Sequence, residues 1–217
     1  MDTKKYMRYK GFTLIELLTV IAVIGILAAI MIPTVGAVRN SARKAKTKTQ
    51  FSQWGAAFEM FKQEYGYYPN FSTTPTTGNY ILADNADAEK FAGTLTGKTL
   101  SGSGTPTDAN LNGNKKKISF YSLSDAELSS TTTANAKIQD AFGNTEIGII
   151  IDVTGDGRIK LDDISGSLTV NAKDGGSFTP TSGGTDRDIP TDGVRAGVIF
   201  YSAGKDGSPK GAVMSWK

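Results

Sequence analysis

The chain contains no cysteine and no histidine among its 217 residues. Without cysteine it can form neither disulfide bonds nor thiolate ligands, so thiol usage does not indicate the redox state of its compartment. The two absences together exclude the usual zinc sites and the usual pairs of nucleophile and base. A hydrolase would have to rely on scattered aspartates, and carboxylates without a visible pairing pattern are usually surface charges. The composition therefore favours a function other than catalysis.

An excess of charge is also lacking over most of the chain. The formal net charge is +3, and the first eleven residues, with four Lys or Arg and one Asp, account for all of it. The remaining residues hold 20 basic and 20 acidic side chains. Because such a balance gives no global field to gather nucleic acid or an anionic substrate, we expect no nucleic-acid partner.

One long apolar run is present near the N-terminus and reaches Val38. From residue 14 to residue 32 the only charged side chain is that of Glu16. At about 1.5 Å per residue, this stretch comes near the thickness of the hydrocarbon core of a bilayer. A carboxylate at the centre of a membrane helix costs about 2.5 to 3.5 kcal/mol, so Glu16 needs a partner. The run predicts one membrane-spanning helix that carries a functional acid.

Gly11 lies before the apolar run, whereas the cleavage site of an ordinary secretory signal lies after it. Cleavage after Gly11 would keep the apolar segment and create a new α-amino group on Phe12. Opposite charges attract far more strongly in a low dielectric than in water, so this amino group could neutralise Glu16 of a neighbouring copy. The alternative is an ordinary membrane anchor, in which Glu16 lies at the interface and is favoured by the helix dipole.

Residues 10–16 read Lys-Gly-Phe-Thr-Leu-Ile-Glu and stand between a basic leader and an apolar helix. In this respect the chain closely resembles the type IV prepilin superfamily. The resemblance implies that residues 1–11 form a leader, and that a prepilin peptidase cleaves between Gly11 and Phe12. It further implies that Phe12 is N-methylated and that Glu16 takes part in subunit assembly.

Pro33 falls toward the end of the apolar run, where proline removes a backbone hydrogen bond and kinks or locally opens a helix. Family members commonly carry proline here, which implies that Pro33 helps subunits to pack or lets a filament stretch. A simple kink of a membrane helix is the alternative. Basic residues on both sides of the span leave the positive-inside count ambiguous. Only the resemblance places the leader in the cytoplasm and the bulk of the chain in the periplasm, beyond the inner membrane.

Helical periodicity continues after the membrane segment. Aromatic residues recur at steps of three and four on one face, namely at Phe51, Trp54, Phe58, Phe61 and Tyr65. Such a stripe predicts a core-facing helix more strongly than a ligand platform. Val38, Ala42 and Ala45 are expected to extend the stripe with small side chains, and Gly66 supplies a stop signal. We therefore expect a single helix from Phe12 to about Tyr65.

The remainder of the chain has the composition of a small sheet domain. Residues 118–123, 146–152, 194–201 and 212–216 are rich in strand-forming side chains. A short helix is expected to begin at Asp84, and residues 124–127 have a capping-box pattern. Residues 96–114 and 165–193 are predicted to be loops. The sequence thus predicts an α+β fold in which a long N-terminal helix packs on a small antiparallel sheet.

This reading divides the chain into three parts. Residues 1–11 are the leader, residues 12–38 are the transmembrane and assembly helix, and residues 39–217 are a pilin-like α+β domain.

Two short motifs narrow the resemblance. Residues 140–144 read Asp-Ala-Phe-Gly-Asn and resemble the Asp-Pro-Trp-Gly-Asn element of type II secretion major pseudopilins, with Ala141 and Phe142 as departures. Residues 201–207 resemble the Tyr-Ser-x-Gly-x-Asp-Gly element of the same proteins. The resemblance implies a non-catalytic pseudopilin that forms a homopolymeric filament and drives protein export. Its implied partners are copies of itself, the prepilin peptidase, an inner-membrane assembly platform and minor pseudopilins.

Two alternatives stay open at this point. The first is a type IV pilus pilin that serves adhesion, motility or DNA uptake. The second is a membrane-tethered periplasmic module that binds calcium and a ligand through its loops. Only the second of these predicts indifference to the loss of Glu16.

Residues 152–163 have the spacing of a calcium-binding loop. Oxygen-bearing side chains occupy positions 1, 3, 5 and 12, glycine occupies position 6, and the carbonyl of position 7 can join them. The candidate ligands are therefore Asp152, Thr154, Asp156, Arg158 and Asp163. The spacing resembles dockerin-type loops, although Thr154 and Lys160 depart from it. A solvated turn is the alternative, because Asp and Gly also favour turn geometry.

The pseudopilin resemblance implies a different calcium position, in the C-terminal loop. There the candidates are Ser202 and Asp206. We expect at most one structural calcium ion, which would stabilise irregular loops that lack disulfides.

Overall fold

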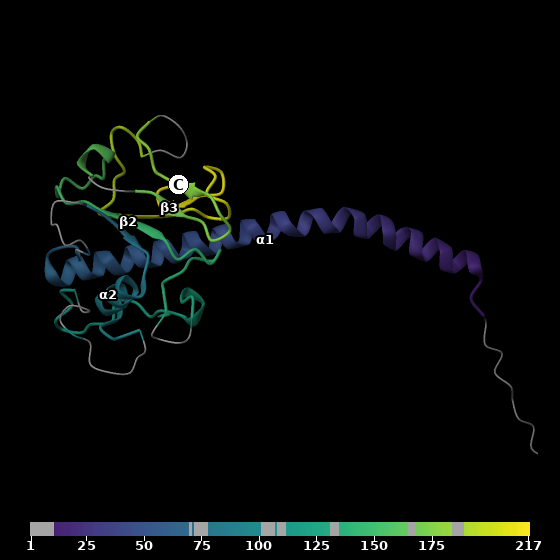
Figure 1. Cartoon of the computed structure of the whole chain (residues 1–217), viewed down its shortest axis with the longest axis horizontal. Helices are drawn as coiled ribbons and strands as arrows, with labels where there is room; N and C mark the ends of the chain where they lie inside the picture. The colour runs from purple at the N-terminus through teal and green to yellow at the C-terminus, as the bar shows by residue number, and fades with distance from the viewer. Residues whose placement is uncertain are drawn as a thin grey trace, which may run out of the picture. The chain divides into compact units, whose positions relative to one another are not determined.

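The computed structural model of the chain (Figure 1) describes residues 11–69, 71, 78–100, 107, 112–130, 135–164, 168–183 and 189–217, apart from the side chains of Pro33 and Asp163. The chain forms two compact units, Met1–Ala42 and Arg43–Lys217. The first unit contains the beginning of helix α1 (Leu14–Tyr65), and the second contains the rest of α1 with all the strands.

Helix α1 confirms the long helix that the sequence predicts. It ends at Tyr65, and Gly66 follows with a φ of +83°, a left-handed conformation that glycine adopts without steric cost. It begins two residues later than expected, because Thr13 precedes the first turn and its side chain accepts the N–H of Glu16. The helix passes through position 33 without interruption. By length and composition, α1 contains a stretch long and apolar enough to cross a membrane.

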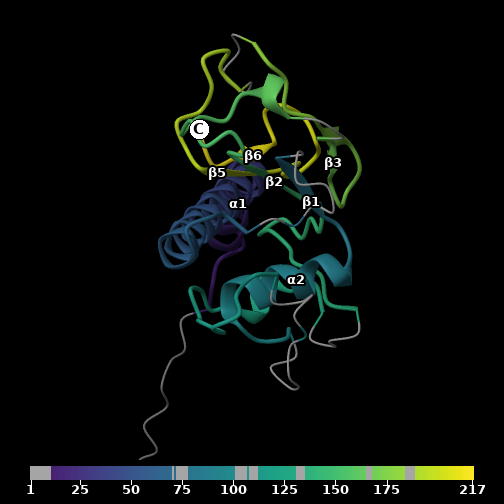
Figure 2. The same ribbon diagram turned by 90° about the vertical axis from the view of Figure 1, so that its left-hand side faces the viewer.

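The sheet consists of β1 (Asn79–Leu82), β2 (Ile147–Ile151), β5 (Val198–Ser202) and β6 (Val213–Met214). Their order is β1-β2-β5-β6, and every neighbouring pair is antiparallel. Helix α2 (Asn85–Thr96) lies with α1 on one face of this sheet, as Figure 2 shows. The sequence predicts that this helix begins at Asp84; it begins one residue later, and the side chain of Asp84 caps it by accepting the N–H of Asp87. The expected α+β architecture is thus confirmed.

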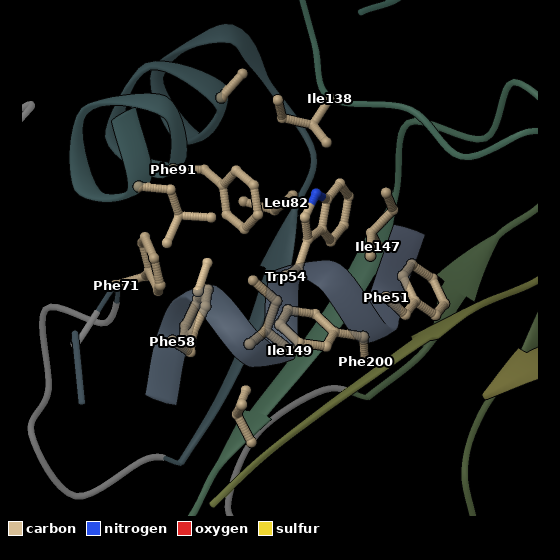
Figure 3. Close-up of a cluster of buried hydrophobic side chains, with 14 of the residues drawn as sticks. Phe51, Trp54, Phe58, Phe71, Leu82, Phe91, Ile138, Ile147, Ile149 and Phe200 are labelled. Carbon is tan, nitrogen blue, oxygen red and sulfur yellow. The ribbon is translucent and has the colours of Figure 1, made fainter. Parts of the chain in front are cut away.

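The main core lies between the helices and the sheet. The aromatic stripe of α1 packs here, with Phe51, Trp54 and Phe58 all fully buried (Figure 3). The ring of Trp54 lies 4.8 Å from that of Phe91 in α2 and 5.7 Å from that of Phe200 in β5, measured between centroids. The stripe is therefore a packing surface, which confirms the core interpretation.

A second core covers the opposite face of the sheet. Successive side chains of a strand point to opposite faces, so Ile149 belongs to the main core while Ile150 belongs to the second. The second core takes Val170 and Phe178 from the short strands β3 (Val170–Asn171) and β4 (Ser177–Phe178). Both strands fall within residues 165–193, which the sequence predicts to be a loop. Strands of two residues carry too little pattern to be recognised from the sequence.

Some details of the sequence prediction are wrong. Val38, Ala42 and Ala45 are exposed and do not extend the buried aromatic stripe. Phe51 lies six positions after Ala45, and at about 100° per residue these two side chains point to different sides of the helix. Residues 118–123 form no strand, although the 3-10 helix η1 (Asp125–Glu127) follows with the predicted capping box. The edge strand β1 was not predicted at all, since its four residues lie between polar segments.

Candidate functional site

The Glu16 carboxylate caps its own helix. Its Oε2 atom accepts hydrogen bonds from the backbone N–H of Thr13 at 2.8 Å and from the Thr13 hydroxyl at 2.7 Å. In return, the N–H of Glu16 donates to the Thr13 hydroxyl at 3.3 Å. This reciprocal pair is a capping box at the start of α1. Every side-chain bond that the structure describes for Glu16 goes to one oxygen atom, and a carboxylate has about four acceptor positions. Glu16 can therefore receive a further donor.

Phe12 and Gly11 precede this cap. Both residues are exposed, and 82% of the Phe12 surface is accessible. They lie outside the helix and are exposed, so an enzyme could reach the bond between them. The basic residues of the leader, at positions 1–10, lie outside the described part of the chain. Cleavage after Gly11 and methylation of Phe12 stay predictions.

The apolar side chains of the first unit are left exposed. Accessible fractions range from 82% at Leu14 to 46% at Val35 along this part of the helix. Isolated soluble proteins rarely expose apolar surface on this scale, so the unit requires a lipid or protein environment. The arrangement suits a membrane helix that can later pack against other helices.

The second unit joins the two pseudopilin-like motifs in one buried network. The Ser202 hydroxyl donates to Oδ2 of Asp140, although the two residues are 62 positions apart in the sequence. The Asn144 side-chain amide donates to Oδ2 of Asp140 at 3.0 Å and to the carbonyl of Gly204 at 2.6 Å. Backbone N–H groups of Phe142 and Asn144 donate to Oδ1 of Asp140. The network thus fixes the loop before β2 to the turn after β5.

The same network lies against helix α1. The Thr47 hydroxyl accepts the N–H of Ala141 at 3.2 Å, and the Gln50 amide donates to the carbonyl of Gln139 at 2.9 Å. Thr47 is fully buried. Burial raises the pKa of Asp140, against the opposing effect of the hydrogen bonds that it accepts. In the sequence, Thr47 and Gln50 are only two polar residues on the helix face next to the aromatic stripe. Nothing there indicates that they contact this network.

A second buried acid was recognised in the sequence only as a cap. Glu127 closes the predicted capping box with the N–H and hydroxyl of Ser124, and its other oxygen accepts from Trp54 Nε1 at 3.1 Å and the Tyr121 hydroxyl at 2.7 Å. Desolvation and this bond to Glu127 raise the pKa of Tyr121. Both oxygens of Glu127 are therefore used within the domain. It is a structural acid, unlike Glu16.

In the candidate calcium loop, the side chain of the first acid, Asp152, is hydrogen-bonded to its own loop. Oδ1 of Asp152 accepts the Thr154 hydroxyl at 3.0 Å and the N–H of Gly155, and Oδ2 accepts the N–H of Gly157. Oδ2 of Asp156 forms an ion pair with Lys160 at 3.1 Å. The side chain of Asp163 lies outside the described residues. Such bonding satisfies the loop as a turn, and a calcium ion bound by Oδ2 of Asp156 would have to displace the ammonium group of Lys160.

The two alternative calcium candidates, Ser202 and Asp206, lie in different environments. Ser202 is fully buried in the Asp140 network, whereas Asp206 is exposed and accepts the N–H of Ser208 at 3.0 Å. Among the residues that the structure describes, no three Asp or Glu side chains lie close enough together to hold a metal ion. Calcium binding stays a prediction at both loops.

Comparison with known proteins agrees with the N-terminal site. Residues 6–32 match the prokaryotic N-terminal methylation motif, a segment that includes Gly11, Phe12 and Glu16. The chain is 38% identical over 76 residues to the type IV major pilin protein PilA of Myxococcus xanthus, which covers 33% of this chain and 34% of that protein. It is 31% identical over 85 residues to the type II secretion system core protein G of Klebsiella pneumoniae, covering 39% and 58%.

A further similarity is to core protein G of Pseudomonas aeruginosa, with 37% identity over 60 residues, 28% of this chain and 42% of that protein. The matches span about a third to three fifths of the length of these relatives. No solved structure matches the chain. The resemblance to the type IV pilin-like superfamily, and to type II secretion major pseudopilins within it, is thereby confirmed.

Proposed function

We propose that the chain is the precursor of a filament subunit, a pseudopilin that drives protein export through a type II secretion system. It catalyses no reaction itself. A prepilin peptidase would cleave it after Gly11, and Phe12 would be methylated on its new amino group. The subunit would then be held in the inner membrane with residues 39–217 in the periplasm.

One observation carries the proposal, namely the bonding of Glu16. This is the one acid of the apolar segment, it lies in a segment that matches the methylation motif, and its described bonds leave acceptor positions open. In a low dielectric, the cationic amino group of Phe12 on another copy would be a strong donor to those positions. The exposed apolar side chains of the first unit would at the same time pack against neighbouring helices.

The proposal includes further partners and one competing role. An inner-membrane assembly platform and minor pseudopilins would receive the subunit. A type IV pilus pilin is the second candidate, and the similarity to PilA supports it. The pseudopilin role is favoured by the two motifs at residues 140–144 and 201–207, which Asp140, Asn144 and Ser202 join. Neighbouring genes for a secretin and a secretion ATPase would favour export, and a retraction ATPase would favour a pilus.

The experiment replaces Glu16 in the full chain. Glu16→Ala should be processed and inserted but should abolish filaments and secretion. Glu64→Ala is the matched control, because Glu64 is an acid of the same helix that pairs at the surface with Lys116. Electron microscopy counts the filaments, and mass spectrometry of the mature N-terminus reads cleavage and methylation. Normal filaments in Glu16→Ala would favour a membrane-tethered module, and an intact Met1 in a peptidase-competent host would contradict processing.

A further inference from the structure

The part of α1 that follows the apolar stretch is strongly basic. Residues 39–48, here called the basic segment, carry Arg39, Arg43, Lys44, Lys46 and Lys48. The chain has no Asp or Glu between Glu16 and Glu59. We infer that the basic segment binds the anionic headgroups of phospholipids in the bilayer that holds the apolar stretch. The inference rests on the membrane anchoring in the proposed function, and it applies to whichever leaflet the segment faces.

Chain connectivity keeps these cations near the membrane surface. The segment begins immediately after Val38 and is ten residues long, which at about 1.5 Å per residue is about 15 Å of helix. The headgroup region is about 5 to 7 Å thick, and charges act over a further 8 Å or so at physiological ionic strength. Lys and Arg side chains can extend along a helix toward headgroups.

Residues 43–48 of the basic segment belong to the second unit and are fixed by contacts within it. Thr47 is fully buried and its hydroxyl accepts the N–H of Ala141, while Lys44 donates to the carbonyl of Lys210 at 3.1 Å. Arg43, Lys46 and Lys48 are exposed, and no ion pair among the described residues includes any of the three. Their charge is thus available without refolding or breaking a salt bridge. Clusters of four or more basic residues beside a membrane helix attract anionic lipid.

Lipid selectivity can be measured on the full mature chain in vesicles of phosphatidylcholine and phosphatidylglycerol. Spin-labelled forms of these two lipids are the probes, and electron paramagnetic resonance gives the fraction of each that the protein immobilises. We expect a preference for phosphatidylglycerol of about fivefold or more at about 0.15 M salt, which falls toward unity at about 1 M.

Two triple variants test whether the basic segment causes the preference. Arg43→Gln, Lys46→Gln and Lys48→Gln together should reduce it by more than half, and they spare Lys44 and the contact that it makes. The matched control is Lys98→Gln with Lys205→Gln and Lys217→Gln, which removes the same charge from exposed sites elsewhere and should leave the preference unchanged.

Three outcomes would overturn the inference. The first is equal association of both lipids with the wild-type chain, and the second is equal loss of preference in the two triple variants. The third is an unchanged lipid preference in the variant of the basic segment together with loss of filaments, which would assign the segment to contact with another copy. Wild-type filaments without any lipid preference would contradict this inference alone and leave the assembly role standing.

Discussion

The two compact units place similar side chains in opposite surroundings. In the first unit the apolar residues of α1 are exposed, as at Leu14 with 82% and Ile32 with 76% of their surface accessible. In the second unit Phe51, Trp54 and Phe58 of the same helix are fully buried against the sheet. Burial of a large apolar side chain contributes about 1.5 to 3 kcal/mol. Only the second unit gains this stabilisation within one chain, and the first must gain it from lipid or other subunits.

Two capping boxes show the same contrast for acids. Thr13 with Glu16 and Ser124 with Glu127 share the same spacing, and in both pairs the acid accepts from the backbone N–H and the hydroxyl of the first residue. Glu127 also accepts from Trp54 and Tyr121, so the domain uses both of its oxygens. Glu16 has no such additional donor among the described residues. One local motif therefore serves folding in one unit and leaves an acid available for assembly in the other.

Replacing Glu127 by alanine should impair folding, whereas replacing Glu16 by alanine should impair assembly. This difference is the largest effect we expect. Glu127→Ala leaves donors of Trp54, Tyr121 and Ser124 without their acceptor, and should cost about 3 kcal/mol or more of unfolding free energy. Thermal unfolding of the detergent-solubilised chain, followed by near-ultraviolet circular dichroism, should then shift down by about 10 °C. Glu16→Ala should leave this transition unchanged. Equal shifts in the two variants would remove the distinction between the two acids.

Two glycines sharpen the comparison within the second unit. Gly148 of β2 lies opposite Tyr201 of β5, and a Cβ atom there would overlap the tyrosine ring. Gly148→Ala should destabilise the domain by about 1 to 3 kcal/mol through overpacking. Gly55 of α1 is the control, because a Cβ there would meet only Phe200 at 4.0 Å. Gly55→Ala should stabilise the helix by up to about 1 kcal/mol, measured by urea unfolding. An unchanged unfolding free energy in Gly148→Ala would mean that the ring of Tyr201 can move away from position 148.

The next prediction concerns the buried carboxyl group of Asp140 and the pH dependence of stability that it causes. The pKa of Asp140 is raised by burial, so the folded chain binds its proton more readily than the unfolded chain does. The stability that this group contributes is present at low pH and declines as pH rises from about 4 through the folded-state pKa.

Asp140→Asn should cost about 1 to 3 kcal/mol, because its amide would face the donor of Asn144. The stability difference from the wild type should narrow as pH rises across that window and then stay constant. Urea unfolding at a series of pH values measures it, and a difference that widens with pH would contradict the direction of the pKa shift.

Calcium should give the smallest effect. If the exposed loop at residues 152–163 binds the ion at millimolar concentration, ten times the dissociation constant stabilises by about 1.4 kcal/mol, or roughly 3 to 5 °C in Tm. Asp156→Asn should remove this shift, since Asp156 is an exposed candidate ligand. Scanning calorimetry of the full chain with calcium and with chelator tests it. An unchanged Tm on chelation would end the prediction of structural calcium.

The sequence predicted the elements whose patterns are long or chemically specific. The end of α1 at Tyr65, the start of α2 next to Asp84 and the strand around Ile149 all follow from local preferences. The second core was missed because its members come from two-residue strands in a segment rich in Ser, Thr and Gly. Thr47 and Gln50 were missed because their role depends on residues about 90 positions away.

The sequence by itself determined the membrane helix, the matched methylation motif and the identity of the acid within the apolar segment, because these depend on residue order along a single helix. Only the tertiary structure decided which acids have their carboxylate oxygens hydrogen-bonded within the domain. Asp140 and Glu127 lose their exposure when distant donors fold around them, whereas the described donors to Glu16 come from Thr13 alone, three residues away. Hydrogen bonds between distant segments form only when the chain has closed its core, and no local pattern records them.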